Sequence, residues 1–451
     1  MSQPDFKFID LFAGIGGFHH ALEAEGGRCV LAVERDPECQ KVYQELFPET
    51  DIVGDIRSLT YIDQEADKGR HLSGETDRTG NRSINELVPD HDVLCAGFPC
   101  QPFSKSGHQE GTEDRTRGTL FHDILQIIRA KAPSFVLLEN VRNLTGPRHQ
   151  DTWAIIIESL REAGYTVDSD PLILSPHRFR EGTVDAPGGA PQVRDRVFIL
   201  AYRNDLDSNS ELPKIDPSNG FDPDSWRIKK HLDFNKDIKG LQDYRLSKEE
   251  LSWLEAWQEF IQGIKSDWLP GFPIWVDAFK TRPEISDDMP SWKQGFLQKN
   301  SDFYVANRKF IDKWRKRTWG DVGTIHDFPA SRRKFEWQAR KAQPLRKDRD
   351  LYKLVLQFRP SGIRVKPPTY LPALVAITQT SIIGSLKRRI TPREAARLQG
   401  MDADRFAAAI KAAGVSDATA YKQLGNAVNV GMVRLAAQAL FAGRSPWVLK
   451  E

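Results

Sequence analysis

Short apolar runs alternate with amphipathic segments from residue 6 to about residue 202, and this alternation constrains the fold more than any other feature of the chain. It is typical of a doubly wound α/β sheet, in which helices connect parallel strands. The runs that predict strands are Phe8–Phe12, Cys29–Val33, Ile52–Gly54, Val93–Ala96, Phe135–Leu138, Tyr165–Asp168 and Val197–Ala201. The segments that predict helices between them are His19–Glu25, Pro37–Phe47, Thr119–Lys131 and Trp153–Ala163. We therefore expect one α/β domain over residues 1–202.

The composition and the patterning of the sequence change after Tyr202. Residues 204–224 have the Asp-, Ser-, Asn- and Pro-rich composition of a linker, and residues 226–337 carry nine of the 11 Trp without a strand–helix alternation. Regular patterning returns at Thr391-Pro392-Arg393-Glu394, which combines an N-cap, a proline at the first helical position and a carboxylate in the first turn. A final apolar helix over about 430–442 should pack into a core. These boundaries predict a second domain over residues 203–387 and a C-terminal segment, 388–451, whose last helix returns to the first domain.

The composition excludes several classes of protein. The 451 residues are 39% hydrophobic and 28% charged, which is typical of a soluble globular protein, and no apolar run is long enough to span a bilayer. The strand-like Phe6-Lys7-Phe8-Ile9 begins too early for a signal peptide. Four Cys without a C-x-x-C spacing argue against a disulfide framework and against a zinc site. We therefore expect a cytoplasmic protein with no metal site and no membrane partner.

Positive charge is concentrated in one part of the chain. The net charge is only +2, but residues 301–366 contain about eighteen Lys and Arg against about seven Asp and Glu. The aromatic residues that interleave with these cations are Trp314, Trp319, Phe335 and Trp337. A solvent-exposed helix face is one explanation for these charges. Binding of a polyanion is the other, and it also explains why the cations are concentrated in one segment. Together with the rest of the chain, this segment favours a nucleic-acid partner.

Cys100 is the strongest candidate for a reactive group. It lies in Gly97-Phe98-Pro99-Cys100-Gln101-Pro102-Phe103-Ser104, which follows the buried run Asp92–Ala96. Proline on both sides argues for a shaped loop instead of regular structure, and a thiol there can reach a ligand as a thiolate nucleophile. The common alternative for a lone Cys is a small buried hydrophobe, and Cys95 fits that description better.

A carboxyl group should face the same edge of the sheet. The apolar run Ser134–Leu138 ends in Glu139-Asn140-Val141, about forty residues after Cys100. Because the carboxyl ends of neighbouring parallel strands line one edge of a sheet, Cys100 and Glu139 should share a pocket. A thiol nucleophile beside a carboxyl group is the outline of an active site.

A ligand-binding turn follows the first strand. Asp10-Leu11-Phe12-Ala13-Gly14-Ile15-Gly16-Gly17 precedes a helix, and its glycines let the backbone approach an anionic group at the start of that helix. Glu34 ends the next strand, where an acidic side chain commonly binds ribose hydroxyls, and Asp55 ends the third. His19 stands where the dinucleotide fingerprint has Gly or Ala, so we expect an adenosine ligand other than NAD. A plain tight turn is the structural alternative.

These motifs occur together in the order seen in DNA (cytosine-5) methyltransferases, and the chain resembles that family. The motifs are Phe12-Ala13-Gly14-Ile15-Gly16-Gly17, Pro99-Cys100-Gln101, Glu139-Asn140-Val141, Gln192-Val193-Arg194-Asp195-Arg196 and Gln423-Leu424-Gly425-Asn426-Ala427-Val428. The resemblance covers about residues 5–202 and 388–440, and it is to bacterial members of the Dcm-like or restriction-modification type. It implies a Rossmann-like, S-adenosylmethionine-dependent catalytic domain and a smaller target-recognition domain in residues 203–387. One departure is Ala373-Leu374, the nearest candidate for a Thr-Leu pair that members often carry late in that domain.

The resemblance also implies a role for each site residue. Cys100 would add to C6 of cytosine, Glu139 would bind the Watson–Crick edge, and Arg194 and Arg196 would complete the catalytic group, with Arg196 on the base carbonyl. The residues implied in binding S-adenosylmethionine are Phe12 on the adenine, Gly14, Ile15 and Gly16 in the turn, Glu34 on the ribose, Asp55 on the adenine amine, and Asn426 with Val428 at the edge of the pocket.

The activity implied is sequence-specific methylation of cytosine C5 in double-stranded DNA, on a base flipped out of the duplex. The enzyme is expected to be a monomer, with a restriction endonuclease acting on the same site as its functional partner. Two alternatives stay open: a tRNA cytosine-5 methyltransferase, against which the large basic insert argues, and a non-catalytic DNA-binding regulator, against which Cys100 and Glu139 argue. Within 203–387, residues Arg359–Lys366 are predicted either to read bases or to form a structural hairpin with solvated Arg.

Overall fold

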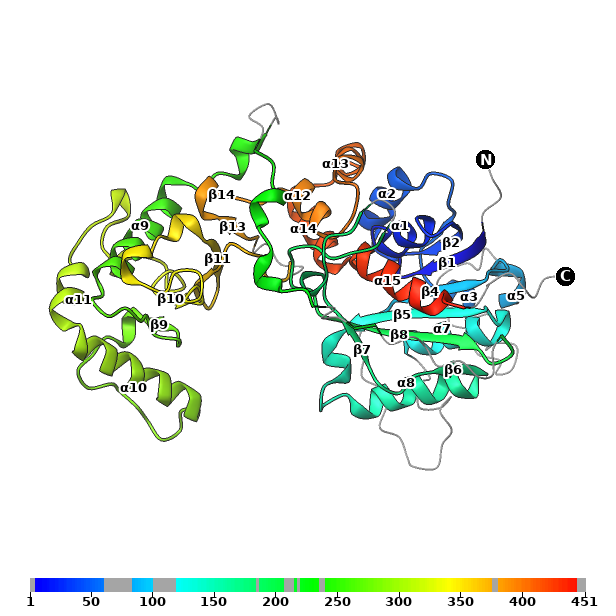
Figure 1. Ribbon diagram of the computed structural model, residues 1–451, viewed down its shortest axis with the longest axis horizontal. Coiled ribbons are helices and arrows are strands. Elements are labelled where there is room, and N and C mark those ends of the chain that lie inside the picture. The colour runs from blue at the N-terminus through cyan, green and yellow to red at the C-terminus, as the bar shows by residue number, and fades with distance from the viewer. Residues whose placement is uncertain are drawn as a thin grey trace, which may run out of the picture. The chain divides into compact units, whose positions relative to one another are not determined.

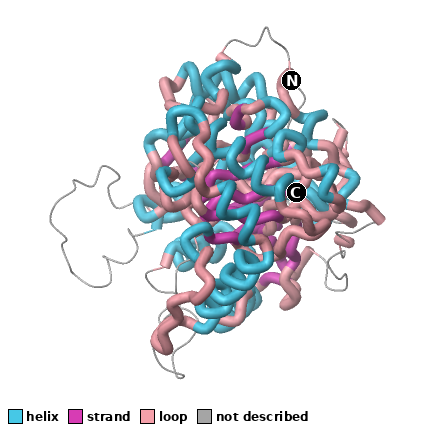
Figure 2. The backbone as a smooth tube through the Cα atoms, turned by 90° about the vertical axis from the view of Figure 1, so that its left-hand side faces the viewer, coloured by secondary structure: helices cyan, strands magenta, loops and turns pink. Residues whose placement is uncertain are grey.

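The computed structural model describes residues 5–60, 83–99, 119–183, 186–206, 215–216, 220–234, 240–374 and 380–443. The chain forms two compact units: unit 1 is Met1–Pro223 with Ala395–Glu451, and unit 2 is Asp224–Glu394. Helices, strands and loops are distinguished by colour in Figure 2. Each unit has its own sheet, and each is described by itself.

Unit 1 is built on a sheet whose order, over the described residues, is β3-β2-β1-β4-β5-β8-β6, with β7 paired to β8 (Figure 1). The strands are β1 (Phe6–Leu11), β2 (Gly27–Val33), β3 (Ile52–Val53), β4 (Val93–Gly97), β5 (Phe135–Val141), β6 (Tyr165–Val167), β7 (Leu172–Leu174) and β8 (Arg196–Arg203). Strands β1 to β5 pair in parallel, and β8 runs antiparallel to β5, β6 and β7. The predicted doubly wound α/β fold is confirmed.

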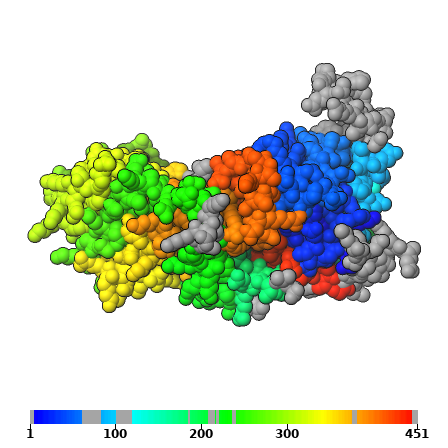
Figure 3. All heavy atoms as spheres, turned by 90° about the horizontal axis from the view of Figure 1, so that it is seen from above, coloured from blue at the N-terminus to red at the C-terminus, as the bar shows by residue number. Residues whose placement is uncertain are grey.

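Helices cover both faces of this sheet (Figure 1). They are α1 (Gly17–Glu23), α2 (Pro37–Leu46), α3 (Arg57–Thr60), α5 (Ile84–Leu87), α7 (Leu120–Lys131), α8 (Gln150–Glu162), α13 (Ala403–Ala412), α14 (Asp417–Asn426) and α15 (Val430–Phe441). Helix α12 (Pro392–Leu398) begins in unit 2. Short 3-10 turns lie at η1 (Arg142–Thr145) and η2 (Pro176–Arg178). Residues such as Ile9 and Leu11 share one core with α3, α5, α7 and α8. On the other face α15 packs against α1, β5 and β8, and α13 packs against α2, as the neighbouring orange and blue atoms of Figure 3 show.

Local chemistry explains where several of these helices begin. Asp36 caps α2 by accepting a hydrogen bond from the Glu38 amide, and a proline occupies the first turn. The predicted start of α12 is confirmed, because the Thr391 hydroxyl accepts from the Glu394 amide at 3.1 Å while the Glu394 carboxylate accepts from the Thr391 amide at 2.7 Å. This reciprocal pair is a capping box.

The structure corrects the expected elements at a few positions. Phe12 was expected at the end of the first strand, but β1 ends at Leu11 and Phe12 adopts a positive φ of 59°, since the chain turns there into the glycine-rich loop. The short elements β7, α3 and α5 were not predicted. The polar, Gly-bearing sequence of Asp63–Asn85 predicts a surface insertion, and most of this segment lies outside the described residues.

Unit 2 contains a second sheet, whose order over the described residues is β14-β13-β11-β12-β10-β9. Its strands are β9 (Ile274–Trp275), β10 (Lys334–Trp337), β11 (Val355–Arg359), β12 (Gly362–Lys366), β13 (Ile382–Ile383) and β14 (Arg388–Arg389). Its α-helices are α9 (Lys248–Gly263), α10 (Ser291–Ala306) and α11 (Arg308–Trp314), and its 3-10 turns are η3 (Pro223–Ser225), η4 (Ile228–His231), η5 (Leu241–Tyr244), η6 (Val276–Ala278), η7 (Gly320–Val322), η8 (Ile325–Asp327), η9 (Arg346–Asp348), η10 (Leu351–Lys353) and η11 (Gly384–Leu386). All pairings are antiparallel except β10 with β12.

Aromatic residues form the core of unit 2. The Trp257 ring stacks on Phe335 with centroids 4.6 Å apart, and the Trp314 indole donates to the Ala256 carbonyl at 2.9 Å. The four rings that interleave with cations in the sequence (Trp314, Trp319, Phe335 and Trp337) are all buried in this core. The rings therefore stabilise the fold, while their neighbours Lys313, Lys316 and Arg317 are exposed.

In the part of the chain that the structure describes, no helix is both long and apolar enough to cross a membrane.

Candidate active site

The predicted site residues of unit 1 gather at the carboxyl ends of parallel strands. β1 lies between β2 and β4, so the connections leave this point of the sheet in opposite directions. Ligands of doubly wound proteins bind at such a switch point. Gly97 at the end of β4 lies opposite Glu139 of β5 in the strand register, so the segment leading to Cys100 starts beside Glu139. Cys100 itself lies outside the described residues.

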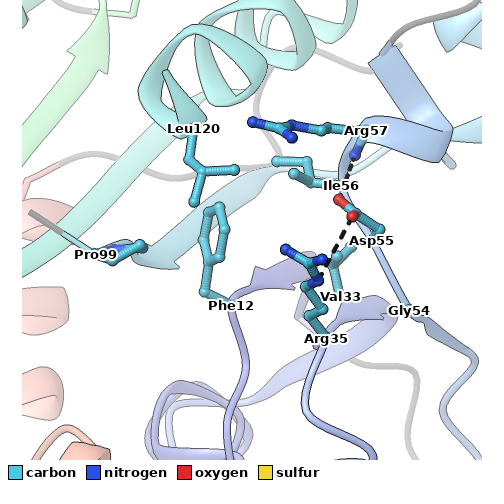
Figure 4. A pocket seen from close by; sticks show the side chains of 9 residues that line it. All are labelled: Phe12, Val33, Arg35, Gly54, Asp55, Ile56, Arg57, Pro99 and Leu120. Carbon is cyan, nitrogen blue, oxygen red and sulfur yellow. Dashed lines mark hydrogen bonds and ion pairs between the residues drawn. The ribbon is translucent and has the colours of Figure 1, made fainter. Parts of the chain in front are cut away.

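A cavity of about 320 Å³ opens at this switch point. It is lined by Phe12, Val33, Arg35, Gly54, Asp55, Ile56, Arg57, Pro99 and Leu120 (Figure 4). Figure 4 shows the Phe12 ring standing between Pro99 and Leu120, with the Asp55 carboxylate on the opposite side. Asp55 accepts from the Arg57 amide at 3.0 Å and lies 3.9 Å from Arg35 Nε. An aromatic face and a carboxylate thus share one cavity with the residue that precedes Cys100.

Glu34 holds the glycine-rich turn beside this cavity. Its Oε2 accepts from the Gly14 amide at 2.7 Å, and its Oε1 accepts from the Asp36 amide at 2.7 Å. Gly14 and Gly16 have φ values of 56° and 80°, and together with Phe12 they form a turn that only residues tolerant of positive φ can build. Glu34 therefore fixes the shape of the turn, and its oxygens keep further lone pairs for a ligand.

Ile15, Asn426 and Val428 do not line the described cavity. Ile15 is fully buried below the turn. Val428 lies so close to the start of α1 that a Cβ at Gly17 would come within 2.7 Å of Val428 Cγ1. Asn426 is exposed at the end of α14. Val428 thus supports the turn through packing.

His19 explains why the dinucleotide fingerprint fails. Its ring stacks on Phe47 with centroids 3.6 Å apart, and its Nδ1 lies 2.7 Å from the Tyr43 hydroxyl. Burial lowers the pKa of His19 to about 3, with smaller contributions from His20 and Arg405. A neutral, packed imidazole occupies the position at which the fingerprint has a small residue.

Glu139 and Arg196 form a pair within the site. Arg196 Nε lies 2.7 Å from Glu139 Oε1, and the Glu139 side chain is only 10% exposed. Burial raises the pKa of Glu139, and the charges of Arg196 and Arg194 oppose that rise without cancelling it. A carboxyl group that readily keeps a proton can donate one hydrogen bond and accept another.

Arg194 is buried and serves a neighbouring part of the fold. Both of its terminal nitrogens donate to the Gly425 carbonyl at 3.1 Å, and its amide donates to the Ser175 hydroxyl at 3.0 Å. Burial, with a smaller contribution from the charge of Arg196 and against the opposing charge of Glu139, lowers the pKa of Arg194 to about 9. Arg194 therefore joins the Gln423–Val428 motif to the site and lies within electrostatic range of Glu139.

Asn140 and Asp10 contribute to the site in ways that the sequence motifs do not predict. Asn140 Nδ2 donates to the Phe98 carbonyl at 2.8 Å, so it anchors the chain two residues before Cys100. Asp10 is fully buried on β1, and burial first, with Glu34 second, raises its pKa to about 8. A signal existed for both, since polar residues inside apolar strands are unusual.

In unit 2 the predicted reading segment is a β-hairpin. β11 and β12 are joined by Pro360-Ser361, with Arg359 opposite Gly362. Arg364 Nε donates to Glu336 Oε2 at 2.8 Å on the neighbouring strand β10. Leu374 of the Ala373-Leu374 pair is buried. The structural alternative therefore accounts for Arg364, whereas base reading by this segment stays a prediction.

Comparison with known proteins identifies relatives. A family model described as C-5 cytosine-specific DNA methylase matches residues 6–442. The Type II methyltransferase M.AluI of Cellulosimicrobium cellulans is 39% identical over a match that covers 96% of this chain and 91% of that protein. The Type II methyltransferase M.HhaI of Haemophilus parahaemolyticus is 37% identical, over 48% of this chain and 55% of that protein. The DNA-cytosine methyltransferase of Escherichia coli (strain K12) is 35% identical, over 48% of this chain and 46% of that protein.

Proposed function

Because this chain belongs to the C-5 cytosine-specific DNA methylase family and is a cytosine-C5 DNA methyltransferase of the restriction-modification type, we propose that it methylates one cytosine within a specific duplex sequence by covalent catalysis with S-adenosylmethionine. The observation that carries this proposal is the shared edge of β1, β4 and β5. There Phe12 and Pro99 line one cavity, and the buried Glu139 lies opposite Gly97. A restriction endonuclease that cuts the same sequence is the partner this function implies.

The cavity suits the adenosine part of the cofactor. The Phe12 ring offers a face for adenine, Asp55 offers a carboxylate to an amine, and Glu34 lies beside them with oxygens for ribose hydroxyls. When bound, S-adenosylmethionine supplies an electrophilic methyl group on its sulfonium. The residues of this chain would hold and orient it, and the Phe12–Gly17 turn would exclude water from its adenosine end.

Glu139 and Cys100 would act on the target base. The Cys100 thiolate would add to C6, which places electron density on C5, the carbon that receives the methyl group. A base then removes the C5 proton, and the bond between Sγ and C6 breaks to restore the ring double bond. Glu139 would donate its proton to N3 and accept from the exocyclic amine, while Arg196 orients it. The base must leave the helix for this, at a cost of a few kcal/mol.

The test of this chemistry is the Cys100→Ala variant together with a covalent trap. In the presence of S-adenosylmethionine, wild-type protein should form a stable adduct with duplex DNA that carries 5-fluorocytosine in the target site, because fluorine does not leave the methylated C5 as the proton does. Cys100→Ala should form no adduct and should not methylate DNA, while it still binds S-adenosylmethionine in calorimetry. A variant that methylated at the wild-type rate would refute covalent catalysis by Cys100.

We also propose that residues 203–387 select the DNA sequence. The match to M.AluI continues across almost the whole chain, whereas the matches to M.HhaI and to the Escherichia coli enzyme cover about half of it. The target of M.AluI is therefore the first sequence to examine. Sequencing host DNA after bisulfite conversion would identify the methylated cytosine, and exchange of residues 203–387 with those of a relative should transfer the target.

A further inference from the structure

A second cavity, of about 450 Å³, lies in unit 2 and has no part in the chemistry above. It is lined by Tyr304 from α10, by Arg308, Asp312 and the following Arg315 and Lys316 at α11, and by His326 from η8. Three of these side chains are cations and one is an anion. The cavity therefore carries an excess of two positive charges before His326 is considered.

One carboxylate organises this group. Asp312 Oδ1 accepts from the Tyr304 hydroxyl at 2.8 Å and lies 3.3 Å from an Arg315 terminal nitrogen, while Asp312 Oδ2 accepts from Arg308 Nε at 3.4 Å. Arg315 also lies over the Tyr304 ring, with its central carbon 5.4 Å from the centroid. The Tyr304 hydrogen bond, assisted by both arginines, lowers the pKa of Asp312. Asp312 thus stays charged and holds two guanidinium groups in defined orientations.

The cations keep donors for a ligand. Arg308 meets Asp312 through Nε, and its side chain is 61% exposed. Lys316 is exposed and forms no ion pair among the described residues. A guanidinium has five N–H donors in a fork that matches phosphate oxygens, and an ammonium adds a point charge. Donors of this kind around one cavity fit a phosphate group.

Several other cations of unit 2 differ from those of the cavity, because they are bound to partners within the fold. Arg349 is 2% exposed and donates to the carbonyls of Ile261 and Ile264 at the end of α9. Arg388 is paired with Glu394, and Arg364 with Glu336. Part of the positive charge seen between residues 301 and 366 therefore stabilises the fold. The cations of the cavity are different, because Arg308 and Lys316 are exposed and Asp312 is the anion that lines the cavity with them.

We propose that the cavity between α10, α11 and η8 is a phosphate-binding site that holds a backbone phosphate of the bound DNA. This inference rests on the proposed role of residues 203–387 in binding DNA. A phosphate contact adds affinity without reading a base, so the site would position unit 2 on the duplex and leave the choice of sequence to other residues.

The experiment compares wild type with the Arg308→Ala/Lys316→Ala double variant. Affinity for the target duplex and for a non-target duplex would be measured by fluorescence anisotropy at several salt concentrations. Loss of one or two phosphate contacts should reduce the slope of log K against log salt by about 0.9 for each contact. Both duplexes should bind about three- to tenfold more weakly at physiological salt. The methylated sequence, and kcat at saturating DNA, should not change.

Lys313→Ala is the matched control, because Lys313 is an exposed lysine of the same helix that does not line the cavity. A salt slope equal to that of wild type in the double variant would overturn the proposal, as would an equal loss in Lys313→Ala, which indicates diffuse electrostatics. Inorganic phosphate provides a second arm: binding of free phosphate that the double variant abolishes, with DNA affinity unchanged, would identify a free-anion site instead. Failure of the DNA-methylating function would appear separately, as wild-type protein that modifies no duplex.

Discussion

The pair Glu139–Arg196 in unit 1 and the pair Glu394–Arg388 in unit 2 contain the same two side chains in opposite surroundings. Glu394 is fully buried and accepts four hydrogen bonds, two from Arg388 and one each from the amides of Asp233 and Thr391. Glu139 is also buried, but one Arg196 nitrogen at 2.7 Å is its principal partner and burial still raises its pKa. The Glu394–Arg388 pair satisfies its charge within the fold. The Glu139–Arg196 pair leaves hydrogen-bonding capacity for a ligand.

This difference shows how two units of one chain use buried charge. Removing one member of a fully satisfied buried pair leaves an uncompensated charge, which is costly. An incompletely satisfied carboxyl group is destabilising by itself and is kept where its chemistry is needed. Glu139 is therefore an incompletely satisfied group at the sheet edge of unit 1, whereas Glu394 is a satisfied group in the interior of unit 2.

The largest expected effect is on the activity of Glu139→Gln. The amide keeps the shape of the side chain but cannot donate a proton to N3, so kcat/KM for DNA methylation should fall about 10²- to 10⁴-fold. The melting temperature should stay equal or rise, because a neutral group replaces a carboxyl group that burial disfavours. A loss of stability with little loss of activity would show that Glu139 stabilises the fold, as Glu394 does, and does not act on the base.

Glu394→Gln should show the opposite result. One of its two oxygens becomes an NH2 group that faces donors of Arg388 or of the Thr391 amide. The free energy of unfolding should fall by about 3–5 kcal/mol, measured by urea denaturation. Glu336→Gln is the control, because Glu336 pairs with Arg364 near the surface and should cost about 1 kcal/mol or less. An equal loss of unfolding free energy in the two variants would show that the Glu394–Arg388 and Glu336–Arg364 pairs contribute equally to stability.

Asp10 provides a pH test of the unbalanced groups in unit 1. Its pKa is about 8 in the fold against 3.8 for the ordinary side chain, so between these values the native protein holds a proton that the unfolded chain has lost. The free energy of unfolding should therefore fall as the pH rises toward 8, by at most about 1.4 kcal/mol per unit. Asp10→Asn should remove this dependence.

Urea denaturation at pH 6 and pH 8 measures that slope. The stability of wild type should decline by about 1–3 kcal/mol relative to Asp10→Asn over this range. Asp51→Asn is the control, at an exposed position of unit 1. Its free energy of unfolding should fall with pH as much as that of wild type. Parallel curves for wild type and Asp10→Asn would show that Asp10 titrates as an ordinary carboxyl group.

Glu34→Ala tests the cofactor side of unit 1. The variant loses the ribose contact that we propose and frees the amides of Gly14 and Asp36. Affinity for S-adenosylmethionine should weaken by about 1–3 kcal/mol, measured by calorimetry, while DNA affinity without cofactor changes little. Glu38→Ala, which removes an exposed side chain paired with Lys41, should bind the cofactor normally. Unchanged affinity in Glu34→Ala would contradict its assignment.

The sequence predicted unit 1 far better than unit 2, for a physical reason. Parallel strands are buried on both faces and read as continuous apolar runs, so β4 and β5 were located to within three residues. The aromatic core of unit 2 has no such periodicity, and the sequence does not show which way Trp314 points. Contacts between distant residues were equally hidden. Arg194 was grouped with Arg196, yet it donates to Gly425, which is 231 residues away in sequence.

The smallest expected effect concerns the β11–β12 hairpin of unit 2. Arg364 is held by Glu336, with the Arg364 side chain 26% and the Glu336 side chain 23% exposed. Arg364→Ala should therefore lower the free energy of unfolding by about 1 kcal/mol or less, and the methylated sequence should stay the same.

Arg359 forms no side-chain ion pair among the described residues, so its guanidinium is the one available to DNA. Arg359→Ala should leave stability unchanged and weaken DNA binding, and if Arg359 reads a base it should also relax specificity at one base pair. Conversion sequencing of plasmid from hosts that express each variant would score every cytosine context. Relaxed specificity in Arg364→Ala with none in Arg359→Ala would reverse this assignment and make the Glu336 pair part of the reading surface.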